Sequence, residues 1–157
     1  MVIVIGPDFE EDATSGDASV LRLRIPPNPR FGKIVRDDVI AHAGRFGILP
    51  ASLEDFLFAV GEGLANAVEH SGTTATIDVT CRIDDEKIVV TIIDSGRGFA
   101  LTAGDTMLPE GLIERGRGIP IMRSCSDIFA VHSTPGRGTA IVIGRYIRPR
   151  PEETSVA

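Results

Sequence analysis

Residues 60–70 read VGEGLANAVEH and close a segment with helical periodicity. Apolar side chains recur every three or four residues from Pro50 onward, which predicts an amphipathic helix that ends before Gly72. The apolar stripe of this helix consists of Leu53, Phe56, Leu57, Val60, Leu64 and Val68. Glu62, Asn66 and His70 are each four residues apart, so we expect them to line one polar stripe roughly opposite the apolar one.

This polar stripe has two interpretations. Taken alone, a Glu, an Asn and a His at this spacing are typical of a solvated helix face. Small residues crowd the same helix, however, at Ala59, Gly61, Gly63, Ala65 and Ala67. A glycine inside a helix costs about 1 kcal/mol relative to alanine. Because small side chains let another group come close to the helix backbone, the pattern also indicates a binding face.

The periodicity elsewhere predicts strands and helices that are separated along the chain. We expect strands at 21–25, 77–83, 87–93, 128–133 and 139–147, and helices at 29–46 and 119–126. Asn28 before Pro29, and Ser52 three residues before Asp55, are typical of helix N-termini. The order of elements predicts an α+β fold, a two-layer sandwich with one mixed, mostly antiparallel sheet and helices on one face.

Length and charge limit the classes of function. The chain has 157 residues, which fits one domain with a substantial core. Its net charge of −6 argues against a nucleic-acid coat and offers no attraction to an anionic membrane. The apolar run Val2–Ile5 is too short for a signal peptide, and no run approaches the roughly 18 apolar residues of a membrane span. We therefore expect a cytoplasmic protein with no nucleic-acid or membrane partner.

Both ends of the chain lack a periodic apolar pattern. We expect residues 1–18 to form a mobile acidic arm, in which Val2–Ile5 either adds an edge strand or is disordered. The proline-containing tail 148–157 is expected to be disordered, which leaves 19–147 as the folded domain. Cys81 and Cys125 lie far apart and outside any CxxC motif, so two buried thiols are favoured over a disulfide or a metal site.

A second candidate site begins where an apolar strand ends. Asp94 opens the string DSGRGF, which holds Gly96 and Gly98. An Asp followed by spaced glycines is often an ordinary turn. Alternatively, a fixed carboxylate can accept a hydrogen bond from the amino group of adenine, and glycines let the backbone pass close to a planar base. Thr139, just after the glycine-containing turn at 135–138, would place a hydroxyl near Asp94.

The segment from 95 to 118 is long, polar and rich in glycine, which is typical of a functional loop or lid. It ends with Gly116, Arg117 and Gly118, directly before the short helix expected at 119–126. Free backbone N–H groups at a helix start can bind a phosphate, and glycines remove the side chains that would block it. Two spaced glycines are weak evidence alone, and Arg117 is equally compatible with a solvated loop.

The ordered combination of motifs is more specific than any one of them. The series Glu-x-x-x-Asn-x-x-x-His, Asp-x-Gly-x-Gly-Phe, Gly-x-Gly and Gly-x-Thr resembles the conserved boxes of the GHKL ATPases (gyrase, Hsp90, histidine kinases and MutL) across 19–147. The string at 60–70 is particularly similar to the bacterial anti-sigma-factor serine/threonine kinases. The glycine box that reads GRGIPIM departs from that family, which more often has leucines and no proline there.

The resemblance implies a Bergerat-type fold that binds ATP and Mg²⁺. Glu62 resembles the catalytic general base, and Asn66 resembles the Mg²⁺ ligand. Asp94 resembles the carboxylate that binds adenine, whereas His70 is given only a structural role. The ATP-binding positions that the resemblance implies are Asn66, Asp94, Gly96, Gly98, Gly116, Arg117, Gly118 and Thr139.

The resemblance also implies a function, with two alternatives. The family member would be a homodimeric anti-sigma factor and protein-serine kinase that binds a sigma factor and phosphorylates a STAS-type antagonist. One alternative is a non-catalytic module whose shape is set by nucleotide, although the presence of Glu62 argues against it. The other is the detached ATP domain of a histidine kinase, which needs a phosphoacceptor histidine on a dimerising helix hairpin. Only one helix is expected before Pro50, and its sole histidine is His42.

Overall fold

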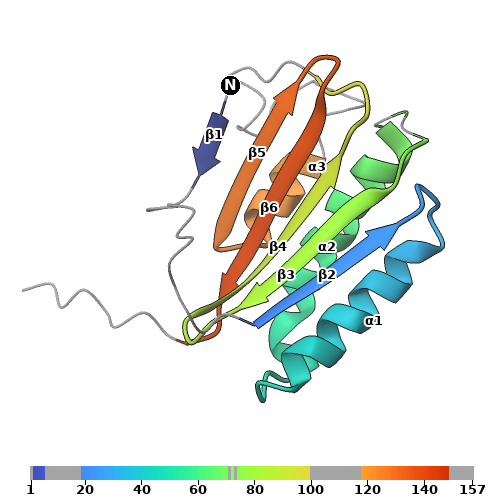
Figure 1. The fold of residues 1–157 in the computed structure, drawn as a ribbon. Helices are drawn as coiled ribbons and strands as arrows, with labels where there is room; N and C mark the ends of the chain where they lie inside the picture. The colour runs from blue at the N-terminus through green and yellow to red at the C-terminus, as the bar shows by residue number, and fades with distance from the viewer. Residues whose placement is uncertain (1, 6–18, 71, 73, 100–117, 149–157) are drawn as a thin grey trace, which may run out of the picture.

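The computed structural model describes residues 2–5, 19–70, 72, 74–99 and 118–148. These residues form a six-stranded sheet with the strand order β1-β5-β6-β4-β3-β2 (Figure 1). The strands are β1 (Val2–Ile5), β2 (Ser19–Ile25), β3 (Ile77–Ile83), β4 (Lys87–Asp94), β5 (Ile128–Thr134) and β6 (Gly138–Tyr146). The helices are α1 (Phe31–Gly44), α2 (Glu54–Ala65) and α3 (Gly118–Ser124), with a 3-10 turn η1 (Pro50–Leu53) before α2 and a π-helical segment η2 (Asn66–His70) after it.

The expected α+β sandwich is confirmed. The helices lie on one face of the sheet, and none of the described helices covers the other face (Figure 1). Every pairing among the described strands is antiparallel, so the sheet contains no parallel pair in this part of the chain. The described strands therefore form an antiparallel sheet, although β4 pairs with β6 and β1 pairs with β5, which are not consecutive in the chain.

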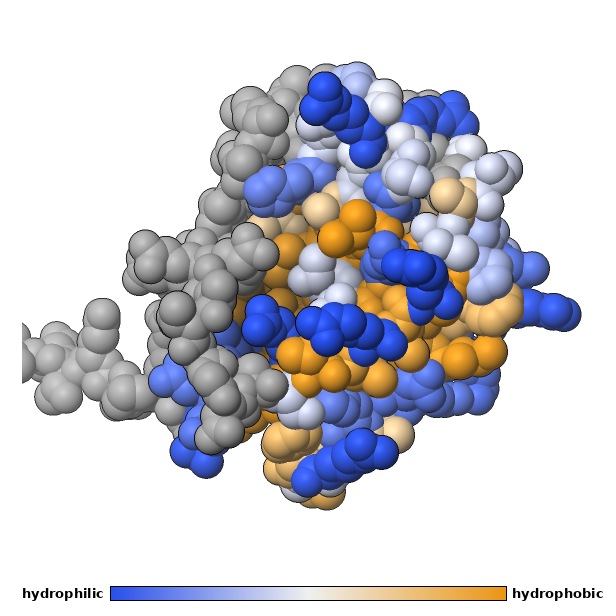
Figure 2. All heavy atoms as spheres, viewed as in Figure 1, coloured by the Kyte–Doolittle hydropathy of each residue, from blue (hydrophilic) through white to orange (hydrophobic). Residues whose placement is uncertain are grey.

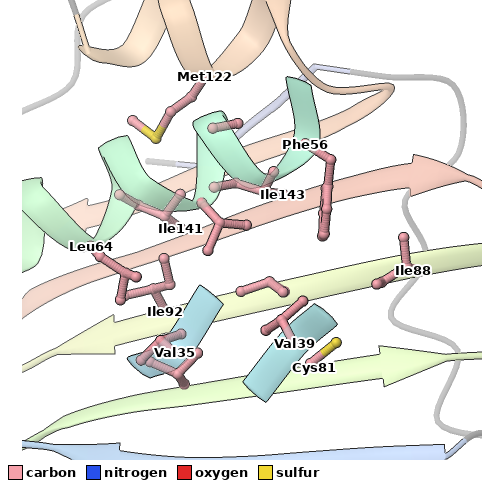
Figure 3. Packing of buried hydrophobic residues seen from close by; sticks show 14 of the residues in the cluster. Val35, Val39, Phe56, Leu64, Cys81, Ile88, Ile92, Met122, Ile141 and Ile143 are labelled. Carbon is pink, nitrogen blue, oxygen red and sulfur yellow. The ribbon is translucent and has the colours of Figure 1, made fainter. Parts of the chain in front are cut away.

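The core lies between the sheet and its helices. Figure 3 shows Phe56 and Leu64 of α2 and Met122 of α3 pointing toward the isoleucines of β4 and β6. A Cβ on Gly63 would lie 2.9 Å from Ile92 Cδ1, so the backbone of α2 rests directly on the sheet at this point. Ala59 and Ala67 are buried as well. Packing against the sheet therefore explains part of the small-residue pattern that also suggested a binding face.

Two local predictions of helix starts are wrong. Helix α1 begins at Phe31, and the Asn28 side-chain oxygen instead accepts a hydrogen bond from the Arg30 N–H at 3.1 Å. Ser52 lies inside η1, where its hydroxyl donates to the Leu49 carbonyl at 2.7 Å. In both cases the polar side chain bonds to a nearby backbone group before the helix starts, a competition that is common for Asn and Ser.

The N-terminal strand settles one alternative that the sequence left open. Val2–Ile5 forms β1 and pairs with β5 in the register Val2↔His132 to Ile5↔Phe129. Residues 6–18 and 149–157, expected to be an arm and a tail, lie outside the described residues. No helix in the described parts of the chain is both long enough and apolar enough to cross a bilayer.

The sheet face without helices carries a second, smaller apolar cluster. Val89, Ile128, Ala130 and Val142 form this cluster, and Tyr146 packs against it. Figure 2 shows apolar residues gathered over the middle of this face, with charged side chains among and around them. Two apolar faces on β4, β5 and β6 explain why these strands lack the simple alternation that a half-exposed sheet would give.

Cys81 provides a direct test of the packing. Both cysteines are free thiols; Cys81 is buried in β3, whereas Cys125 is only partly buried. Burial raises the pKa of Cys81 to about 12, and the thiolate is the reactive form. We therefore expect a thiol reagent at pH 8 to modify Cys125 well before Cys81, which should react only after unfolding. Mass spectrometry of peptides from the folded protein measures this, and equal rates at the two sites would contradict the packing of β3.

Candidate functional site

Asp94 is a buried carboxylate at the end of β4. It lies opposite Thr139 of β6 and is 6% exposed. Its Oδ1 atom accepts a hydrogen bond from the Gly96 N–H at 2.9 Å, and the Thr139 N–H also bonds to this side chain. Burial raises the pKa of Asp94, and the two backbone N–H groups oppose that shift. The carboxylate is therefore held in one orientation with little water around it.

Two hydroxyl groups extend this polar region across the sheet. Thr139 Oγ1 lies 2.8 Å from Ser133 Oγ, and both side chains are buried. The Phe99 N–H donates to Ser133 Oγ at 2.9 Å. Since Asp94, Thr139 and Ser133 are successive partners on β4, β6 and β5, they share the helix-facing side of the sheet at one end.

Ser133 is a site residue that the sequence interpretation missed. It follows Phe129 and Val131 at the inward-facing positions of β5, where the other side chains are apolar. A polar residue at an inward position of an otherwise apolar strand was the signal that could have indicated it. Thr139 pairs directly with Asp94 across β4 and β6, and its hydroxyl lies beside Ser133 Oγ.

Two glycines, Gly98 and Gly138, let the loop after β4 and the β5–β6 turn pack closely together. Gly98 has φ of +59°, and a Cβ there would lie 2.2 Å from the Thr134 carbonyl oxygen. Gly138 has φ of +95°, and a Cβ there would lie 2.1 Å from the Asp94 carbonyl oxygen. Neither position has space for a side chain. The loop after β4 is thereby pressed against the β5–β6 turn, which fixes the edge of the polar region around Asp94.

Glu62 and Asn66 lie near the end of the helix that precedes this region, and they face different surroundings. Half-buried Glu62 borders a hollow of about 530 Å³ between α1 and α2, which Arg30, Lys33 and Arg36 also line. Asn66 faces Gly118 instead: a Cβ on Gly118 would lie 3.2 Å from Asn66 Nδ2 and 3.4 Å from Oδ1. The start of α3 therefore rests against the Asn66 amide.

The helix carrying these residues changes its winding at Asn66. The segment η2 is π-helical, so the four-residue spacing from Asn66 to His70 no longer corresponds to one α-helical turn. Short π-helical segments occur often at functional sites. Because η2 packs on β4, the end of this helix lies against the strand that ends in Asp94.

The predicted site residues thus fall into three groups. Asp94, Gly96, Gly98 and Thr139 come together at one end of the sheet. Asn66 and Gly118 meet where η2 contacts α3, and Glu62 lies one turn earlier on α2. Gly116 and Arg117 lie outside the described residues, as does most of the segment expected to be a lid.

The donor set suits a nucleotide with a hard cation. A single amide oxygen from Asn66 is adequate for Mg²⁺, which prefers oxygen ligands, keeps several waters and is bound largely through phosphate oxygens. Asn66 contacts a glycine rather than a bulky side chain, so its amide is not enclosed by neighbouring side chains on that side. The buried carboxylate of Asp94 is the kind of acceptor that an adenine amino group requires.

Comparison with known proteins gives relatives of about the same length as this chain. An anti-sigma F factor from Caldanaerobacter subterraneus is 27% identical over 135 residues, which cover 82% of this chain and 94% of that protein. A serine-protein kinase RsbW from Oceanobacillus iheyensis is 29% identical over 138 residues, which cover 81% of this chain and 86% of that protein.

Solved structures show the same fold. The structure of the RsbU and RsbW domains of Rv1364c from Mycobacterium tuberculosis matches 83% of this chain with a TM-score of 0.63 at 18% identity. The chain spans 33% of the length of that two-domain protein. The family model described as a histidine kinase-like ATPase domain matches residues 25–144. That match includes α1, α2, α3, the buried Asp94 and the Ser133–Thr139 pair, and the chain therefore belongs to the histidine kinase-like ATPase domain family.

Proposed function

We propose that the chain is an ATP-binding protein-serine kinase and anti-sigma factor. The observation that carries this proposal is the buried carboxylate of Asp94, fixed by backbone N–H groups beside the Ser133–Thr139 hydroxyl pair. The similarity to anti-sigma F factors and to RsbW serine-protein kinases supports the choice of partner class. The partners would be a sigma factor and a STAS-type antagonist that carries the serine.

The proposed site assigns a role to each group. Asp94 binds the adenine amino group, with Gly96, Gly98 and Thr139 around the base. Asn66 holds the Mg²⁺, which neutralises phosphate charge when bound. Gly116, Arg117 and Gly118 contact the phosphates. The assignments of Gly116 and Arg117 rest on the resemblance of the motifs alone, and the others rest also on the positions of the described residues.

Glu62 would act as the general base. A carboxylate within reach of the serine hydroxyl can accept its proton as the oxygen attacks the γ-phosphorus and the bond to the β-phosphate oxygen breaks. Glu62 borders the hollow between α1 and α2, which is lined by three basic side chains. Glu69 lines the same hollow, and Lys33 is paired with Asp37 at 2.8 Å, so a partner protein that presents its serine to Glu62 would meet a surface of mixed charge. The proposal also implies a cytoplasmic protein that acts as a homodimer.

Asp94→Asn tests the nucleotide site. We expect wild-type protein to bind ATP in the presence of Mg²⁺, and the variant to bind it about tenfold or more weakly, because a hydrogen bond to a charged acceptor is lost. Isothermal titration calorimetry with and without Mg²⁺ measures both. Absence of ATP binding by the wild type would contradict the proposed function, and undiminished binding by the variant would contradict the role of Asp94.

Thermal melting without nucleotide is the control for this variant. Since burial raises the pKa of Asp94, the folded protein favours the neutral acid more than the unfolded chain does. The stability that the protonated Asp94 contributes to the folded protein is fully present below the ordinary pKa of aspartate, about 4. It is lost as the pH rises through the raised pKa of Asp94. At pH 7 the ionised carboxylate therefore costs stability, and asparagine has no such charge. We expect Asp94→Asn to melt no lower than wild type at pH 7, so that weaker binding reports the site rather than unfolding.

A further inference from the structure

Arg97 contacts two segments that border the proposed nucleotide site. It lies in the loop after β4, between Gly96 and Gly98. Its carbonyl oxygen accepts a hydrogen bond from the Gly136 N–H at 2.7 Å, which ties the loop to the β5–β6 turn. Its side chain lies against Gly72, just beyond the helix segment that carries Asn66.

The contact with Gly72 is close enough to depend on a glycine. Gly72 has φ of +64°, and a Cβ there would lie 2.9 Å from Arg97 Nη2, 3.1 Å from Nε and 3.3 Å from Cζ. The guanidinium group therefore occupies space that any side chain at residue 72 would fill. The positive φ also favours glycine at this position, independently of the contact.

This contact bridges the two halves of the proposed site. The loop that holds Arg97 also supplies the Gly96 N–H to Asp94 and the Phe99 N–H to Ser133. Gly72 follows η2, whose first residue is Asn66. The adenine side of the site is thus joined through one arginine side chain to the end of the helix on the magnesium side.

We propose that Arg97 is a positioning residue that couples the adenine loop to the Asn66 segment, so that adenine and the magnesium–phosphate group are bound cooperatively. The inference rests on the proposed nucleotide site. It deepens that function by naming a group that sets the relative placement of the two halves. The side chain acts through Gly72 and does not need to touch the nucleotide.

Arg97→Ala is the first test, with ADP as the probe. We expect its affinity for ADP in Mg²⁺ to fall about tenfold, a typical size for coupling between two sites. The loss of ADP affinity in this variant should be smaller without Mg²⁺, because ADP is then held mainly by the adenine half of the site and little coupling remains to be lost. Arg97→Lys should recover part of the affinity, since its alkyl chain can still lie over Gly72. Arg82→Ala, which removes an exposed arginine from the helix-free face of the sheet, is the matched control and should bind as wild type does.

Gly72→Ala separates a coupling role from direct contact with the nucleotide. A methyl group there displaces Arg97, so this variant should reproduce the effect of Arg97→Ala. The double variant should bind ADP no more weakly than the weaker of the two single variants. Equal losses with and without Mg²⁺, or additive losses in the double variant, would overturn the coupling role.

Hydrogen exchange makes the test independent of nucleotide binding. In protein without nucleotide, Arg97→Ala should speed exchange of the Phe99 amide, which donates to Ser133 in the same loop. If wild-type protein binds no ADP, the proposed function fails. The exchange rate then still decides whether Arg97 holds the loop, and an unchanged rate would overturn that role.

Discussion

Glu62→Gln is expected to lower the rate of serine phosphorylation by about 10²–10⁴-fold, the range that a positioned general base contributes. Glutamine has nearly the same shape but cannot accept the proton of the serine hydroxyl. Because Glu62 borders the hollow between α1 and α2 rather than the Asp94 region, ATP affinity should change little. Transfer of labelled phosphate from ATP to a STAS-type antagonist measures the rate, and calorimetry measures the affinity.

Glu54→Gln is the matched control for this prediction. Glu54 is exposed in the first turn of α2, on the same helix as Glu62 but at its other end. The substitution removes the same charge far from the proposed reaction, so we expect wild-type kinase activity. Equal activity of Glu62→Gln and wild type would show that Glu62 is not the base. A chain that binds ATP but phosphorylates no serine substrate in either form would instead be a non-catalytic binding module.

Gly98→Ala is expected to destabilise the fold and to remove nucleotide binding. The methyl group would lie 2.2 Å from the Thr134 carbonyl oxygen and 3.0 Å from the Gly138 carbonyl oxygen, both of which belong to the backbone. The left-handed conformation at +59° adds a cost of about 1–2 kcal/mol for any residue with a Cβ. Since the backbone atoms must move apart, we expect a total loss of roughly 3 kcal/mol or more in the free energy of unfolding. Urea denaturation followed by circular dichroism measures it.

Gly136→Ala separates the cost of a left-handed backbone from the cost of the close contact that is found at Gly98. Gly136 also has a positive φ, of +79°, but no atom lies within 4 Å of the position of its Cβ. This variant should therefore lose only about 1–2 kcal/mol, the cost of the left-handed conformation alone. A loss at Gly98 no greater than the loss at Gly136 would mean that the loop after β4 is not pressed against the β5–β6 turn.

The amino-acid sequence determined the elements and the motifs of this protein. Apolar periodicity predicted α1, α2, α3 and the strands β2 to β6, because a stripe or an alternating face must be buried against another element. The order of polar and glycine motifs predicted the family, which the match over residues 25–144 confirms. The sequence could not choose between strand and disorder for Val2–Ile5, since four apolar residues pair only if a strand edge is available.

The tertiary structure decided how the motifs meet. Asn28 and Ser52 match N-cap preferences, yet each side chain bonds to a backbone group ahead of the α-helix. Asn and Ser side chains can bond to several nearby backbone groups, and the tertiary structure decides which bond forms. Gly63 is a packing residue: its lack of a side chain serves the contact with Ile92, which is far away in sequence.

The same holds for the proposed site. Asp94 and Thr139 were predicted to be near each other, but the role of Ser133 depends on the register of β5 on β6. The contact of Asn66 with Gly118 and that of Arg97 with Gly72 join residues that no spacing rule connects. Periodicity describes one element at a time, whereas distances between elements follow from how a whole core packs. The sequence by itself thus indicated most residues of the proposed site, whereas the tertiary structure added Ser133 and decided which of these residues touch.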